Sequence, residues 1–130
     1  MSYFVGLTPV VRIVIVNRFS GAVYPRGSTM AAVLDTGYEG FLAVPEDVYL
    51  SLGFGEGVSS TREGVLADGK EVEIRSALAS AEVHGTGTRC QGPVDTWHGL
   101  NEVLAGTQFL RWFNASLDYC SGVLRLVPCG

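Results

Sequence analysis

The chain has 130 residues, a formal net charge of −4 and a hydrophobic share of 47%. This composition excludes a disordered chain, and one lysine with eight scattered arginines gives no clustered positive charge for binding nucleic acid. The length suits one domain with a real hydrophobic core. Because the hydrophobic share is slightly high for a monomer, we expect part of the apolar surface to form an interface between copies.

The N-terminal segment has no basic region ahead of its apolar residues, and Pro9 and Arg12 interrupt them, so no signal peptide is expected. The longest apolar run, around residues 13–16, is too short to span a bilayer. We therefore expect a cytoplasmic protein without a membrane partner.

The three cysteines, Cys90, Cys120 and Cys129, lack the C-x-x-C spacing of a zinc site, so we expect neither a metal nor a cofactor. They are expected to be buried or semi-buried thiols. Cys120 and Cys129 lie at unequal distances from the turn of one expected hairpin and should not face each other. A bridge from Cys129 to a second chain stays open.

Seventeen glycines and many short Val, Ile and Leu runs favour a turn-rich, mainly β chain. A β-branched run predicts the first strand, and the strand that returns after turn residues 24–28 makes a wide hairpin with it. A proline followed by two acidic residues starts a short helix, which a glycine ends. In order, the expected elements are strands at 10–16, 29–34 and 41–44 and a helix of about two turns from Pro45 to Gly53.

The clearest hairpin signal is Asp68-Gly69, within residues 64–75. Asp-Gly is typical of two-residue turns in which both residues have positive φ. Beyond the turn, Val72 and Ile74 alternate with charged residues, so this strand should have one solvent-exposed face. The other expected elements are a loop at 55–60, a strand at 77–83, a loop at 91–99, an apolar segment ending in glycine at 102–106, a helix at 108–113, and a hairpin of strands 115–119 and 123–127.

Residues 32–34 form an apolar run that predicts a buried strand and delivers Asp35, Thr36 and Gly37 in succession. One interpretation is an ordinary turn, since Asp bonds the backbone two residues on and Gly tolerates positive φ. The other is catalysis by paired carboxylates, because two carboxyl groups held close together cannot both ionise, so one acts as acid and the other as base. The chain offers one Asp-Thr-Gly, so this chemistry requires two chains to meet at Asp35.

The order of these elements resembles the retropepsin-like aspartic peptidases, in particular the small single-domain members of bacteria and archaea. The matching segments are residues 33–45, the helix ending at 52–54, residues 104–110, and the closing segments 117–119 and 122–126.

The resemblance implies a mainly β, retropepsin-like closed barrel, one half of an acid protease, with one or two short helices in a single domain over residues 1–130. It also implies that Asp35 of each chain in a homodimer holds one water. Thr36 would bond across the two-fold axis, and Gly37 would let a substrate backbone approach closely.

The hairpin at 64–75 would then be the flap that closes over a peptide or protein substrate. Tyr38 and the tip residues Ala67, Asp68 and Gly69 are the expected substrate contacts. An ordinary exposed hairpin is the alternative. Two functions follow: a homodimeric aspartic endopeptidase, or a non-catalytic dimer of the same fold that binds a peptide or protein in the cleft between its subunits.

Overall fold

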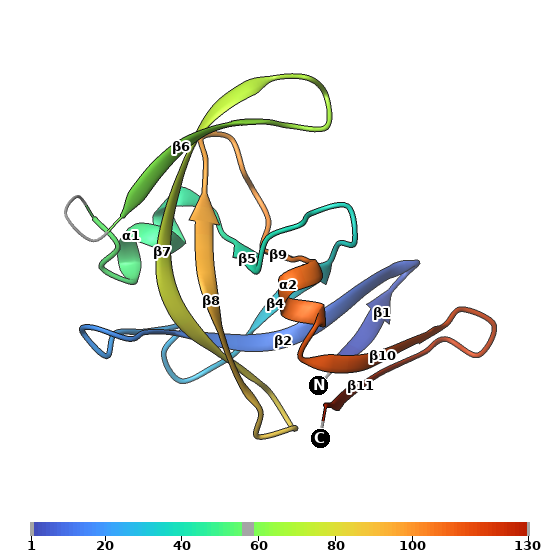
Figure 1. The fold of residues 1–130 in the computed structure, drawn as a ribbon. Coiled ribbons are helices and arrows are strands. Elements are labelled where there is room, and N and C mark those ends of the chain that lie inside the picture. Colours follow the sequence, from blue (N-terminus) through green and yellow to red (C-terminus); the bar gives the residue numbers. More distant parts are fainter. Residues whose placement is uncertain (1, 56–58, 130) are drawn as a thin grey trace.

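A closed barrel of six strands forms the body of the protein (Figure 1). The computed structural model describes residues 2–55 and 59–129. Around the barrel the strands are β2 (Thr8–Asn17), β4 (Met30–Leu34), β9 (Leu104–Ala105), β5 (Leu42–Ala43), β8 (Arg89–Thr96) and β7 (Glu71–Val83). The barrel closes because β7 also pairs with β2.

The remaining elements lie outside this ring of strands. They are β1 (Ser2–Val5), β3 (Val23–Tyr24), β6 (Ser60–Val65), the helices α1 (Glu46–Ser51) and α2 (Thr107–Leu110), and a separate two-stranded sheet of β10 (Phe113–Asp118) and β11 (Val123–Pro128). Strand accounts for 51% and helix for 8% of the chain, so the expected mainly β closed barrel with short helices is confirmed. None of the helices within the described ranges is long and apolar enough to cross a membrane.

Alternating side chains of β2 build one wall of the core: Val11, Ile13 and Ile15 are fully buried. This is the period-2 pattern of a strand with one face inside. The rings of Phe41 and Phe109 lie 5.9 Å apart and join α2 to the barrel interior. Full burial of side chains of this size contributes roughly 1.5–3 kcal/mol each, so the barrel rests mainly on apolar packing.

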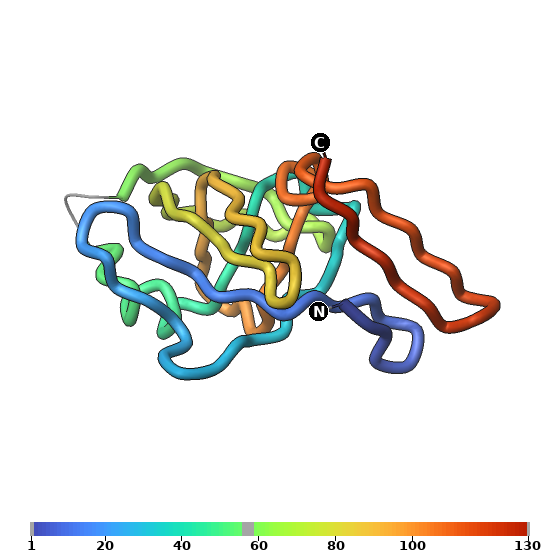
Figure 2. The backbone as a smooth tube through the Cα atoms, turned by 90° about the horizontal axis from the view of Figure 1, so that it is seen from below, coloured from blue at the N-terminus to red at the C-terminus, as the bar shows by residue number. Residues whose placement is uncertain are grey.

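The β6–β7 hairpin extends beyond the barrel, and its tip lies over the loop at 35–41 (Figures 1 and 2). Its turn differs from the expected two-residue type. The N–H of Leu66 donates to the carbonyl of Lys70 at 2.8 Å, which leaves three residues in the loop. Gly69 has a φ of 84°, whereas Asp68 does not have a positive φ. The Asp68 carboxylate accepts the Lys70 N–H at 2.9 Å, which satisfies this turn without left-handed Asp.

The prediction that the strand after the turn has one solvent-exposed face is confirmed, since Val72 is buried and Glu71 and Glu73 are exposed. Residues 56–58 of the expected loop at 55–60 lie outside the described residues, and Ser60 already belongs to β6.

The expected loop at 91–99 is wrong, because most of it belongs to β8, which pairs with β7 over eight residues. Pro93 made the segment look irregular, since proline lacks an N–H for a strand ladder. In the barrel it pairs with Leu78 of β7, and pairing with β5 starts only at the next residue, Val94. Proline is compatible with a strand at this position, because it precedes the first residue that pairs with β5.

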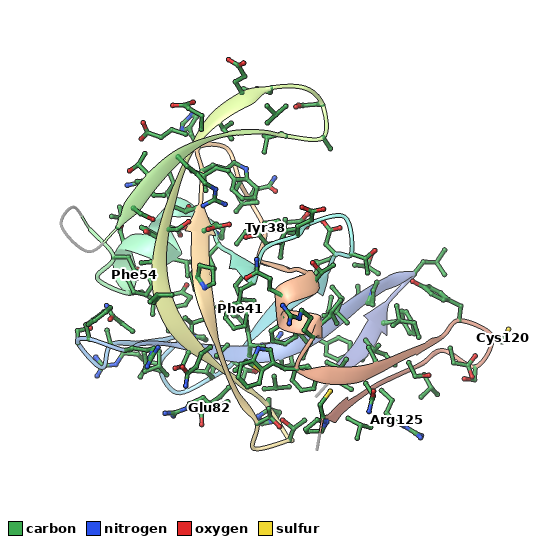
Figure 3. All side chains as sticks on the ribbon, in the orientation of Figure 1. Tyr38, Phe41, Phe54, Glu82, Cys120 and Arg125 are labelled. Carbon is green, nitrogen blue, oxygen red and sulfur yellow. The ribbon has the colours of Figure 1, made fainter. Side chains whose placement is uncertain are left out.

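The helix expected at 108–113 is shorter, because α2 ends at Leu110 and Phe113 starts β10 with its side chain buried in the core. The buried thiol expected at Cys90 is confirmed, but Cys120 and Cys129 are exposed. Figure 3 shows Cys120 at the tip of the β10–β11 hairpin, which projects from the barrel. All three are free thiols.

Candidate active site

Asp35 follows the last residue of β4 and is half-buried, while Thr36 and Gly37 beside it are exposed. The N–H of Asp35 donates to the carbonyl of Ala105 at 2.9 Å. One carboxylate oxygen accepts the N–H of Gly37 at 2.9 Å, and the Asp35 carbonyl accepts the N–H of Tyr38 at 3.2 Å. This is a tight Asp turn of the kind that the simple turn interpretation predicts. It also holds a carboxylate at the mouth of the barrel, as the catalytic interpretation requires.

The segment at 104–106 lies directly behind this turn. β9 runs parallel to β4, with Leu34 opposite Ala105, and antiparallel to β5. Gly106 then packs so closely that a Cβ atom there would lie 2.3 Å from the carbonyl oxygen of Gly40 and 2.4 Å from that of Tyr38. Glycine is therefore required at this position by contact with backbone.

The first residues of α2 fasten the loop that follows Asp35. The N–H of Thr107 donates to the Tyr38 carbonyl at 2.9 Å, and that of Gln108 to the Gly40 carbonyl at 3.1 Å. These bonds use helix N–H groups that have no partner within the helix. The loop is thus held by hydrogen bonds to both β9 and the start of α2.

Tyr38 turns its side chain away from solvent. Its hydroxyl donates to a carboxylate oxygen of Asp95 at 2.5 Å and lies 3.1 Å from the carbonyl of Leu42. A Cβ atom on Gly40 would lie 2.2 Å from this hydroxyl, so glycine leaves the space that Tyr38 fills. Burial and the bond to Asp95 raise the pKa of Tyr38 above its usual value. The hydroxyl is therefore a stable neutral donor.

Asp95 is a functional candidate that the sequence did not indicate. It lies on β8, with 1% of its surface exposed. Besides the Tyr38 hydroxyl, it accepts hydrogen bonds from the Ser76 hydroxyl and from the Arg62 guanidinium, the latter at 3.1 Å. Its segment was expected to be a loop, and the partners stand 19, 33 and 57 residues away along the chain. No local pattern could have revealed this cluster.

The predicted flap residues Ala67, Asp68 and Gly69 are all exposed at the hairpin tip. Beneath them, a small apolar cluster joins the hairpin to the loop and to the chain after β8. Its buried members are Ala43, Val72 and Trp97, and Tyr38, Leu66, Ile74, Leu100 and Leu104 pack against them. The structure thus brings Tyr38 and the hairpin together, with the hairpin tip over the loop at 35–41 (Figures 1 and 2).

A cavity of about 630 Å³ lies elsewhere, between the β6–β7 hairpin, α1 and the start of the chain after β8. Glu46, Arg75 and His98 are among its lining residues, and Asp35 is not. Arg75 donates to Glu46 at 2.6 Å there. Among the described residues, no group of three His, Cys, Asp or Glu side chains is arranged to hold a metal ion.

Comparison with known proteins finds similarity both to a protein sequence and to solved structures. No family model matches the chain. An uncharacterized protein of Archaeoglobus fulgidus is 34% identical over 126 residues, which cover 97% of this chain and 98% of that protein.

Among solved structures, the EIAV protease in complex with the inhibitor HBY-793 matches with a TM-score of 0.61 and 16% identity, over 85% of this chain and 92% of that one. A retropepsin-like aspartic protease from Rickettsia conorii matches with a TM-score of 0.61 and 19% identity, over 92% of both chains. These likenesses show the fold, which is that of retropepsin-like proteases. By its identity and coverage, the chain belongs to the family of the Archaeoglobus fulgidus protein.

Proposed function

We propose that the protein is a homodimeric aspartic endopeptidase in which the Asp35 carboxylates of two copies jointly hold one water. The observation that carries the proposal is the Asp35 turn, which ends a barrel strand of a retropepsin-like fold and is clamped by β9 and α2. An ordinary surface turn needs no such support. Each chain supplies one carboxylate of this kind, so the chemistry requires a second copy.

In the proposed reaction one Asp35 carboxylate takes the proton of the water, while the other, protonated, polarises the scissile carbonyl. The two groups titrate as a unit, so pH dependence belongs to the pair. The exposed hydroxyl of Thr36 would bond across the axis, and Gly37 would let a peptide backbone approach.

A surface suited to a second copy supports the proposal. Val5, Leu7, Tyr119 and Val127 are 59%, 80%, 53% and 46% exposed. They belong to the β1–β2 turn and to the β10–β11 hairpin. These segments extend to the same side of the molecule as the Asp35 loop and the β6–β7 tip (Figures 1 and 2). Contact between two such surfaces about a two-fold axis would bring identical residues face to face.

The β6–β7 hairpin is proposed as the flap, with Ala67, Asp68 and Gly69 contacting bound peptide and excluding water. Tyr38 would contribute its ring and main chain to the substrate, because its hydroxyl is already bonded to Asp95. An exposed hairpin without this role would leave cleavage unchanged when its tip is altered.

The test is cleavage of a peptide library at acid to neutral pH by the wild-type protein and by Asp35→Asn. We expect the substitution to abolish cleavage, since an amide cannot take the proton from the water. Asp47→Asn, which changes an exposed carboxylate at the start of α1, is the matched control and should cleave normally. Light scattering should give twice the 13.9 kDa chain mass.

Equal cleavage by wild type and Asp35→Asn would contradict the proposal, as would a monomer at the concentrations that cleave. A well-folded but inactive dimer, whose peptide binding is unchanged by Asp35→Asn, would instead favour the non-catalytic binding module.

A further inference from the structure

The buried carboxylate of Asp95 takes no part in the proposed chemistry, yet it joins three separate segments. Its side chain is 2% exposed. One oxygen accepts the Tyr38 hydroxyl at 2.5 Å and the Arg62 guanidinium at 3.1 Å, and the other accepts the Ser76 hydroxyl. Arg62 also donates to the Ser76 hydroxyl at 2.7 Å. A carboxyl group withdrawn from water needs such donors, so this cluster has a well-defined geometry.

One arm of the cluster leads to Asp35. Tyr38 bonds Asp95 through its side chain, while its N–H donates to the Asp35 carbonyl at 3.2 Å and its carbonyl accepts the Thr107 N–H. The same residue is therefore held at its ring and at its main chain. Loss of the hydroxyl would free the ring and loosen the turn that orients the Asp35 carboxylate.

The other arm leads to the base of the β6–β7 hairpin. Arg62 lies on β6, opposite Ile74 of β7, and its guanidinium reaches back to Asp95 on β8. Its side chain is 54% exposed, in contrast to the buried carboxylate that it meets. The hairpin base and the Asp35 loop thus share one acceptor.

We propose that Tyr38, Asp95 and Arg62 form a positioning network that fixes the Asp35 turn relative to the β6–β7 hairpin. None of the three touches the reacting atoms in this role. The inference rests on the proposed peptidase function for its effect on rate, and on the hydrogen bonds alone for its effect on the turn. A change in the position of the hairpin would therefore reach the Asp35 loop through the Asp95 carboxylate.

The kinetic test uses Tyr38→Phe, Arg62→Met and the double variant. We expect each single change to lower kcat about tenfold with KM within about twofold, as for loss of a hydrogen bond to a charged group. The double variant should lose less than the product of the two, since both act through Asp95. Independent, fully multiplicative effects would contradict the coupling.

Two control variants remove the same two groups, a tyrosine hydroxyl and an arginine guanidinium, at positions away from the site. Tyr49→Phe removes a hydroxyl that bonds Ser59 at 2.6 Å. Arg89→Met removes a guanidinium that is also 54% exposed and pairs with Glu82 at 3.4 Å. Both controls should keep the wild-type kcat.

A second readout needs no cleavage: hydrogen exchange of the Gly37 amide, which donates to Asp35. We expect this exchange to be about tenfold faster in Tyr38→Phe and Arg62→Met, and unchanged in the controls. Unchanged exchange in both would overturn the network. If exchange is faster in the two variants but the wild-type protein cleaves no peptide, the proposed function is overturned and the network is not. Arg62 is half-exposed, so we expect Arg62→Met to fold. Its exchange rate therefore tests the network even if Tyr38→Phe fails to fold.

Discussion

Replacing Gly106 by alanine tests whether the clamp behind the Asp35 turn is as tight as its geometry indicates. The added Cβ would lie 2.3 Å from the Gly40 oxygen, 2.4 Å from the Tyr38 oxygen and 2.7 Å from a ring carbon of Tyr38. Cβ atoms are essentially never found within 3.0 Å of such neighbours. Two of the three atoms are backbone, so a change of rotamer cannot relieve the overlap.

The loss of stability can be worked out from the segments that the added Cβ would displace. Overpacking of a tight site costs about 1–3 kcal/mol. Withdrawal of α2 would also weaken the bonds from Thr107 and Gln108 to the same two oxygens, at about 1 kcal/mol each. We therefore expect the free energy of unfolding to fall by roughly 4 kcal/mol, and the melting temperature by about 15 °C for a chain of this length.

Urea titration followed by circular dichroism measures this change. Gly55→Ala is the matched control, because a Cβ there meets nothing within 4 Å and its φ is not positive. It should stay within about 0.5 kcal/mol of the wild type. A Gly106→Ala protein as stable as this control would refute the reasoning.

Two further predictions concern titratable groups. Burial raises the pKa of Tyr38 and of Tyr49, so both stay protonated in the native state where unfolded tyrosine ionises. The free energy of unfolding should therefore fall as pH rises above about 10, by up to ~1.4 kcal/mol per pH unit for each tyrosine, and Tyr38→Phe should reduce this slope in urea titrations; an unchanged slope would contradict the assignment. Burial raises the pKa of the Cys90 thiol to about 12, so a thiol reagent at pH 8 should modify Cys120 and Cys129 in the native protein and the third thiol only in denaturant. Three fast-reacting thiols would count against a buried Cys90.

The parts of the fold that the sequence predicts well are those with local causes. The strand before Asp35, the helix stopped at Gly53 and the turn near Gly69 follow from apolar runs and turn residues a few positions apart. The Asp35 turn of the candidate site is predictable for the same reason, because its hydrogen bonds join the Asp35 side chain to its immediate neighbours. Such patterns do not depend on the rest of the chain.

The parts that the sequence could not predict depend on distant partners. β8 looked irregular around Pro93 and becomes a strand only beside β7. Nothing in the sequence around Asp95 marks it as a functional candidate. Only the folded structure brings three donors from distant positions to its carboxylate. Pairings of this range are set by the closed barrel. The three-residue turn at the hairpin tip is a different case, because its cause is local: the Asp68 carboxylate accepts the Lys70 N–H, and only Gly69 has a positive φ.

The 13-residue strand β7 gives the hairpin a mechanical character of its own. Residues 71–76 pair with β6 on one edge, residues 75–82 pair with β8, and residues 79–83 also pair with β2. The strand is therefore bonded on both edges within the barrel wall, whereas its outer residues 71–74 pair with β6 alone. A force on the tip should bend the strand where its pairing with β8 ends, next to residue 75, close to where Arg62 reaches Ser76. As the proposed flap, the hairpin should therefore swing as one unit with its two strands still paired.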